Sequence, residues 1–172
     1  ISSLSENQHD AHSVRLLKDF GMLNFKFEDE QILRARRAYY GSISYIDQML
    51  GRILATLKAT GAAENTAVVF TSDHGEMLGE RGMWFKKHFF EPALKVPLFI
   101  YAPWIKSTRV NSPVSLVDLL PTFCGLATGA EWQSNVEDLE GSDLTVLFDD
   151  ENKDRAVYAE YLAEATTAPI FM

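Results

Sequence analysis

The sequence has a single cysteine, no long apolar run and fewer basic than acidic residues, and each of these features argues against certain kinds of protein. Cys124 is the only cysteine in 172 residues, so no internal disulfide can form. Cysteine usage therefore does not indicate whether the protein works in an oxidising or a reducing compartment. The sequence has no apolar run of about eighteen residues and no charged-then-apolar leader, so it predicts neither a membrane span nor a signal peptide. With 16 lysine and arginine against 24 aspartate and glutamate, the net charge of −8 opposes binding to nucleic acid or anionic membranes.

The remaining composition is that of an ordinary globular domain. Hydrophobic residues make up 47% and charged residues 23%, and the length suffices for one domain with a substantial core. The sequence closes on an apolar run at 169–172 (PIFM) that has strand character. We therefore expect the chain to be part of a longer polypeptide.

Hydrophobic periodicity predicts alternating helices and strands. Residues 1–27 show no clear period, whereas 28–60 carry one helical stripe with Gly61 as its C-cap. The stripe consists of Tyr39, Ile43, Ile46, Leu50, Ile53 and Leu57. A second helix is predicted at 115–127, with Ser115 as N-cap, Asp118 three residues on and a break near Pro121. Short β-branched and aromatic runs predict strands at 67–71, 97–101 and 156–161. This order indicates an α/β fold in which the long helix packs on a sheet.

Chemically informative residues follow the first predicted strand directly. Asp73 and His74 stand where that strand ends, which is the edge where α/β sheets bind ligands, and both side chains can ligate a metal. Lys86, thirteen positions on, could bring a positive charge to an anionic substrate there. Asp73 could instead cap a helix, His74 could be a buried structural side chain, and Lys86 could be a solvated lysine. The aromatic residues around Lys86 favour its partial burial; they are Trp84, Phe85, Phe89 and Phe90.

Several ordered motifs closely resemble the sulfatase family of the alkaline-phosphatase-like superfamily. They are 39–47 (YYGSISYID), 71–75 (TSDHG), 78–82 (LGERG), 84–86 (WFK), 90–91 (FE), 96–98 (VPL) and 118–122 (DLLPT). The resemblance implies a mainly parallel sheet flanked by helices, incomplete in this chain. It further implies that 1–155 form the C-terminal part of the catalytic α/β domain and that 156–172 begin a smaller subdomain.

The resemblance also implies roles for the site residues. Asp73 and His74 would be two ligands of one divalent cation, Ca²⁺ foremost, with Mg²⁺ or Mn²⁺ as alternatives. Lys86 would bind the sulfate oxygens and stabilise the leaving oxygen, so that His74 and Lys86 are the expected catalytic residues. Nearby, Glu80 and Arg81 are expected to pair and brace the loop, whereas His88 could line the pocket or lie on the surface.

Within the family, three segments look most like choline sulfatases. They are 72–82 (SDHGEMLGERG), 12–16 (HSVRL) and 160–164 (EYLAE). This likeness implies a small anionic ester, choline sulfate, as the substrate, and a cytoplasmic protein. Glu164 would hold the quaternary ammonium, with Glu160 as a substitute and the face of Trp84 as an aid, although Glu164 could equally be a solvated loop residue. A phosphonate or phosphodiester hydrolase of the same superfamily remains an alternative.

The nucleophile motif of the family is missing from this sequence. Sulfatases use a formylglycine made within Cys/Ser-x-Pro-x-Arg, but Cys124 has neither the proline nor the arginine and is expected to be a packing thiol. The family's N-terminal Asp-Asp metal pair is also missing. We therefore expect the formylglycine to lie outside this chain and the chain alone to be inactive, or to act as a non-catalytic module. The oligomeric state stays open, with a homo-oligomer of the full-length protein as one option.

Overall fold

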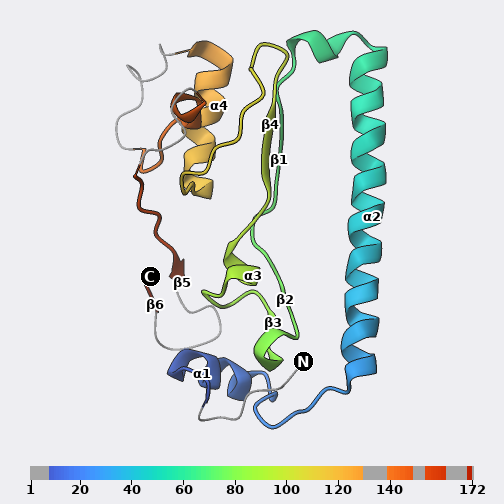
Figure 1. Cartoon of the computed structure of the whole chain (residues 1–172), viewed down its shortest axis with the longest axis vertical. Helices are drawn as coiled ribbons and strands as arrows, with labels where there is room; N and C mark the ends of the chain where they lie inside the picture. The colour runs from blue at the N-terminus through green and yellow to red at the C-terminus, as the bar shows by residue number, and fades with distance from the viewer. Residues whose placement is uncertain (1–7, 130–138, 149–153, 162–169, 172) are drawn as a thin grey trace. The chain divides into compact units, whose positions relative to one another are not determined.

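The computed structural model describes residues 8–129, 139–148, 154–161 and 170–171 (Figure 1). Its helices are α1 (Ala11–Asp19), α2 (Asp29–Ala59), α3 (Glu91–Leu94) and α4 (Leu119–Thr128), with 3-10 turns at Ala62–Asn65, Glu80–Gly82, Leu116–Asp118 and Leu144–Leu147. Its strands are β1 (Val68–Thr71), β2 (Met77–Leu78), β3 (Trp84–Phe85), β4 (Leu98–Tyr101), β5 (Glu160–Tyr161) and β6 (Ile170–Phe171). The chain forms two compact units, one of Ile1–Glu64, Phe70–Phe99 and Glu160–Met172, the other of Asn65–Val69 and Ile100–Ala159.

The long helix α2 confirms the prediction for 28–60. The helix begins with a capping box, in which the side chain of Gln31 accepts a hydrogen bond from the backbone N–H of Glu28. Gly61, with a φ of 74°, follows the end of the helix. The expectation that its apolar stripe packs on a sheet is wrong within the described residues. Ile32 is the one buried residue of α2, whereas Ile46 and Ile53 are 53% and 58% exposed. The described strands form only two-stranded sheets, which present no broad face to such a helix.

The strands confirm two of the three predictions. β1 and β4 pair with each other and match the predicted 67–71 and 97–101. The third prediction, 156–161, is too long, because only its last two residues enter the β5–β6 pair and the residues before them, 156–159, are irregular. The β2–β3 and β5–β6 pairs are antiparallel. A mainly parallel sheet and a domain boundary after residue 155 therefore stay predictions.

Helix α1 was not expected, because residues 1–27 lack a long period. Its N-cap is Asp10, whose carboxylate accepts from the backbone N–H and the hydroxyl of Ser13 at 2.9 and 2.6 Å. Burial raises the pKa of Asp10, but these hydrogen bonds outweigh burial and hold that pKa below its usual value. Leu17 packs into a small core with Met77, Met83 and Ala93. The helix thus closes the core beneath the β2–β3 hairpin.

In the second unit, the helix predicted at 115–127 begins as a 3-10 turn and continues as α4. The predicted capping box of Ser115 and Asp118 is present. The helix changes from the 3-10 turn to α4 between Asp118 and Leu119, close to Pro121, which agrees with the break or kink expected near this proline. Cys124 is a free, partly buried thiol within α4.

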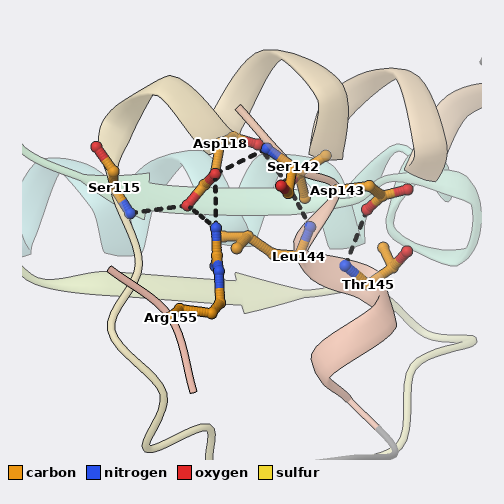
Figure 2. A network of polar contacts seen from close by, with 8 residues as sticks. Ser115, Asp118, Ser142, Asp143, Leu144, Thr145 and Arg155 are labelled. Carbon is orange, nitrogen blue, oxygen red and sulfur yellow. Dashed lines mark hydrogen bonds and ion pairs between the residues drawn. The ribbon is translucent and has the colours of Figure 1, made fainter. Parts of the chain in front are cut away.

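A buried carboxylate ties this unit together (Figure 2). Asp118, 2% exposed, accepts from the backbone N–H groups of Ser115 and Ser142 at 2.8 Å each. Arg155 donates to both of its carboxylate oxygens at 2.9 Å. The Asp118 carboxylate therefore connects three segments that are distant in sequence. Its role is to stabilise the fold, and it is not part of the predicted site.

Candidate active site

The loop after β1 is held by the backbone of α3. The N–H groups of Gly75 and Glu76 donate to the carbonyl oxygens of Ala93 and Pro92, each at 2.8 Å. A Cβ on Gly75 would collide with the Pro92 carbonyl, so only glycine permits this approach. The end of β1 is therefore fixed just where Asp73 and His74 project.

The imidazole of His74 is held in one tautomer. Its Nδ1 lies 2.7 Å from the carbonyl oxygen of Gly75, which can only accept, so Nδ1 carries the proton and Nε2 presents a lone pair. Nε2 accepts from Lys86 Nζ at 2.7 Å and lies 3.4 Å from Asp73 Oδ2. The structure thus brings together the three site residues predicted from the sequence.

The carboxylate of Asp73 stays ionised and open to solvent. Its side chain is 82% exposed, against 34% for His74. Desolvation raises the pKa of Asp73, but hydrogen bonds to its carboxylate, first from the His74 backbone N–H and also from the Ser72 hydroxyl, hold that pKa below its usual range. A negatively charged oxygen therefore lies beside the His74 lone pair.

These two donors fit a divalent cation. A carboxylate oxygen and a neutral imidazole nitrogen suit Ca²⁺, Mg²⁺ or Mn²⁺, and the Nδ1 contact to a backbone carbonyl is the usual support of a ligating histidine. Within the described ranges, no group of three or more His, Cys, Asp or Glu side chains could hold a metal. This chain therefore offers two ligands, and a complete coordination shell needs further ones.

Lys86 follows β3 at a strained turn. Phe85 has a φ of 71°, which is rare for a residue with a side chain, and its ring packs on Phe20 with the centroids 5.6 Å apart. The expected partial burial of Lys86 is wrong, since both Phe85 and Lys86 are exposed. The aromatic rings pack on other rings, such as Trp84 on Phe27 at 5.3 Å, and leave the ammonium at His74.

The loop between β2 and β3 is braced by a different pair from the one expected. Glu80 pairs with Arg36 of α2 at 2.8 Å, not with Arg81, and its other carboxylate oxygen accepts from the Leu78 backbone at 2.6 Å. Arg81 instead stacks over Phe90 at 4.6 Å. Residues 36 and 80 are far apart in sequence, and no local pattern indicated their pairing.

His88 is buried and does not lie on the surface. The residue is 6% exposed, and burial lowers its pKa to about 4, with the nearby His12 adding to the shift. The imidazole is therefore neutral near pH 7. The sequence left its place undecided, and the aromatic run around it was the one available signal for burial.

Of the predicted choline-binding residues, Glu160 and Trp84 lie in the described part of the chain. Glu164 lies outside the described residues, and Glu160 is exposed in β5. Trp84 is half-buried, with its ring edge-on to Phe27. In the described part of the chain, every helix is too short or too polar to span a bilayer.

Comparison with known proteins gives consistent matches. The sulfatase family model matches residues 4–130. A choline-sulfatase of Rhizobium meliloti (strain 1021) is 36% identical over 170 residues, which are 99% of this chain and 33% of that protein. Arylsulfatase K of Danio rerio is 43% identical over 102 residues, 59% of this chain and 20% of that protein.

A solved structure is also similar to this chain. The phosphonate monoester hydrolase of Silicibacter pomeroyi has a TM-score of 0.66 and 32% identity, covering 81% of this chain and 27% of its own. This likeness supports the alkaline-phosphatase-like α/β class. The chain spans about a third or less of the length of the relatives it matches.

Proposed function

We propose that this chain, which belongs to the sulfatase family, supplies part of the metal site and the sulfate-binding lysine of an enzyme that hydrolyses sulfate esters. The observation that carries the proposal is the contact of Lys86 Nζ with His74 Nε2 at 2.7 Å, beside Asp73. A sulfate ester carries negative charge on its transferring group, and its leaving oxygen gains charge as the ester bond breaks. Fixed positive charge at that point lowers the barrier.

Asp73 and His74 would hold a divalent cation through a carboxylate oxygen and Nε2. When bound, the cation supplies positive charge toward the sulfate oxygens. Nε2 has a single lone pair, so its bond to a cation and its hydrogen bond from Lys86 exclude each other. Lys86 would then turn its ammonium to the sulfate oxygens and the leaving oxygen, a short movement for a flexible, exposed side chain.

Choline sulfate is the proposed substrate. The support is the 36% identity to a choline-sulfatase along nearly the whole chain, together with the acidic segment at 160–164. A carboxylate at Glu164, or at the exposed Glu160, suits a quaternary ammonium, which offers charge but no hydrogen-bond donor. The formylglycine nucleophile is expected on polypeptide outside this chain, so the chain alone should be inactive.

A phosphonate monoester is the second candidate substrate. The specific support is the likeness to the phosphonate monoester hydrolase of Silicibacter pomeroyi. A phosphonate monoester is also a tetrahedral anion, and the same cation and lysine would serve it. The geometry of Asp73, His74 and Lys86 does not distinguish the two substrates, so turnover must.

The test is product release by the intact protein that contains this chain, with choline sulfate, an aryl sulfate and a phosphonate monoester. We expect choline sulfate to dominate, and Lys86→Met to lower kcat by roughly 100-fold or more. Lys106→Met, at another exposed lysine, is the matched control and should leave kcat unchanged. Dominant phosphonate turnover would overturn the substrate, and a normal kcat for Lys86→Met would overturn the role of the lysine.

A further inference from the structure

Helix α1 contacts the segment around Lys86 near both of its ends. Near its start, His12 has its Nε2 2.9 Å from the carbonyl oxygen of Lys87, which lies 75 residues further along the chain. Just after its end, the ring of Phe20 packs on the ring of Phe85, and the Lys87 ammonium stands over it at 5.6 Å from the centroid. Residues on both sides of Lys86 are therefore held by one helix that is distant in sequence.

The His12 imidazole is held in one tautomer by two groups of fixed character. Its Nδ1 lies 2.9 Å from an NH₂ group of Arg15, about one turn further along α1, and a guanidinium can only donate. Nδ1 therefore carries a lone pair, and the proton of the neutral ring is on Nε2. The carbonyl oxygen of Lys87 can only accept, so Nε2–H donates to it. Both contacts require the same tautomer and form a directed chain from Arg15 through His12 to Lys87.

The Lys87 carbonyl belongs to the backbone turn that carries Lys86. Phe85 precedes Lys86 with a φ of 71°, a conformation that persists only where its surroundings fix it. On the other side, the backbone N–H of His88 donates to the carbonyl oxygen of Lys86 at 2.8 Å and closes the turn. The peptide between residues 87 and 88 is planar, so the bond from His12 to its oxygen also fixes the N–H that closes the turn. The orientation of this one peptide plane therefore sets the backbone from which the Lys86 side chain starts.

We infer that His12 is a positioning residue for Lys86, acting through its Nε2 hydrogen bond to the carbonyl oxygen of Lys87. The inference rests on the proposed function of Lys86 as the sulfate-binding charge. His12 acts on the backbone alone, and from that backbone the ammonium reaches His74 Nε2 at 2.7 Å. Arg15 selects the form of the ring that donates to Lys87. Misplacing a transition-state charge by about 1 Å costs on the order of 100-fold in rate.

Two amide side chains distinguish the two ring nitrogens of His12. Glutamine brings its NH₂ near the place of Nε2 and can still donate to the Lys87 carbonyl oxygen, whereas asparagine reaches only as far as Nδ1. In the intact protein, we expect His12→Gln to keep kcat within about threefold and His12→Asn to lower it by roughly 10- to 100-fold, with KM changing less than kcat. Asp19→Asn, at an exposed position of the same helix, is the matched control and should leave kcat unchanged. A lower melting temperature with an unchanged kcat in His12→Asn would indicate a purely structural role and overturn the inference.

Amide hydrogen exchange gives a readout that does not depend on turnover. The His88 amide, which donates to the Lys86 carbonyl oxygen, should exchange about tenfold faster in His12→Asn than in His12→Gln, while the amides of α2 stay unchanged. Should the wild type hydrolyse no sulfate ester, the proposed function fails, but this exchange contrast still decides whether His12 holds the turn. Equal exchange in the two variants, with equal kcat where turnover is measured, would overturn the inference.

A further pair of variants covers the case in which substitution of His12 prevents folding. Arg15→Met leaves His12 in place but removes the donor that fixes its tautomer. We expect it to lower kcat by about tenfold and to speed exchange of the His88 amide, and Arg15→Lys, which keeps a donor, to reverse part of both effects. Normal kcat and normal exchange in Arg15→Met would show that the orientation of His12 does not govern Lys86 and would also overturn the inference.

Discussion

Replacing Gly75 by alanine should destabilise the protein far more than a single methyl group suggests. The new Cβ would collide with the carbonyl oxygen of Pro92, and that oxygen cannot move freely because it accepts the N–H of Glu76 at 2.8 Å. The second bond of this contact, from Gly75 to Ala93, is equally short. Relief of the collision therefore requires the two segments to separate.

The magnitude follows from these contacts. Overpacking a fixed site costs about 1–3 kcal/mol, and each lost backbone hydrogen bond costs a further 0.5–1.5 kcal/mol or so. We expect Gly75→Ala to lower the free energy of unfolding by roughly 2–6 kcal/mol. Since His74 Nδ1 is oriented by the Gly75 carbonyl, the affinity for a divalent cation should fall as well.

The assay is urea unfolding of the intact protein, followed by titration calorimetry with Ca²⁺ and Mn²⁺. Gly51→Ala is the matched control: Gly51 lies within α2 with open space where its Cβ would be, so alanine there should stabilise by about 0.5–1 kcal/mol. A loss below about 1 kcal/mol for Gly75→Ala would refute the claim that the approach of Gly75 to Pro92 fixes the loop.

Three further predictions concern charges. Asp118→Asn should lower the free energy of unfolding by roughly 3–5 kcal/mol because it leaves Arg155 without its buried carboxylate, whereas the exposed Asp154→Asn should stay within about 0.5 kcal/mol in the same urea titration. Asp73→Asn should weaken Ca²⁺ or Mn²⁺ binding by about tenfold or more in calorimetry without changing the melting temperature; unchanged affinity would remove Asp73 from the ligands. His88 has a pKa of about 4 in the folded protein against 6.5 ordinarily, so the unfolded chain binds more protons between these values. Stability should therefore fall by up to about 3 kcal/mol as pH drops from 6.5 to 4, and a fall of the same size in His88→Gln would contradict this assignment.

Local patterns predicted the elements whose signals are local. The capping box and the helical period of α2, and the apolar runs of β1 and β4, lie within single segments, and the structure has them at nearly the predicted bounds. The proximity of Lys86 to His74 was also predicted, because the family motifs place both at the same site. Their roles as ligand and catalytic groups stay predictions.

Features that depend on distant contacts were missed. Helix α1 is nine residues long, so its few apolar positions give a weak period, and its burial depends on Met77 and Met83 far along the chain. The pairing of Arg36 with Glu80 joins two elements that share no local pattern. Lys86 is exposed directly after Phe85, whose positive φ is a conformation that its residue type disfavours.

The exposed stripe of α2 also determines how this protein can be handled. A helix of 31 residues is about 46 Å long, and its isoleucines at 43, 46 and 53 stand in solvent in this chain. Apolar bands of that extent promote association between copies in solution. When the chain is produced alone, its light scattering should therefore rise with protein concentration under conditions in which it is still folded. Its solubility, and not its free energy of unfolding, would then limit the protein concentration that can be used.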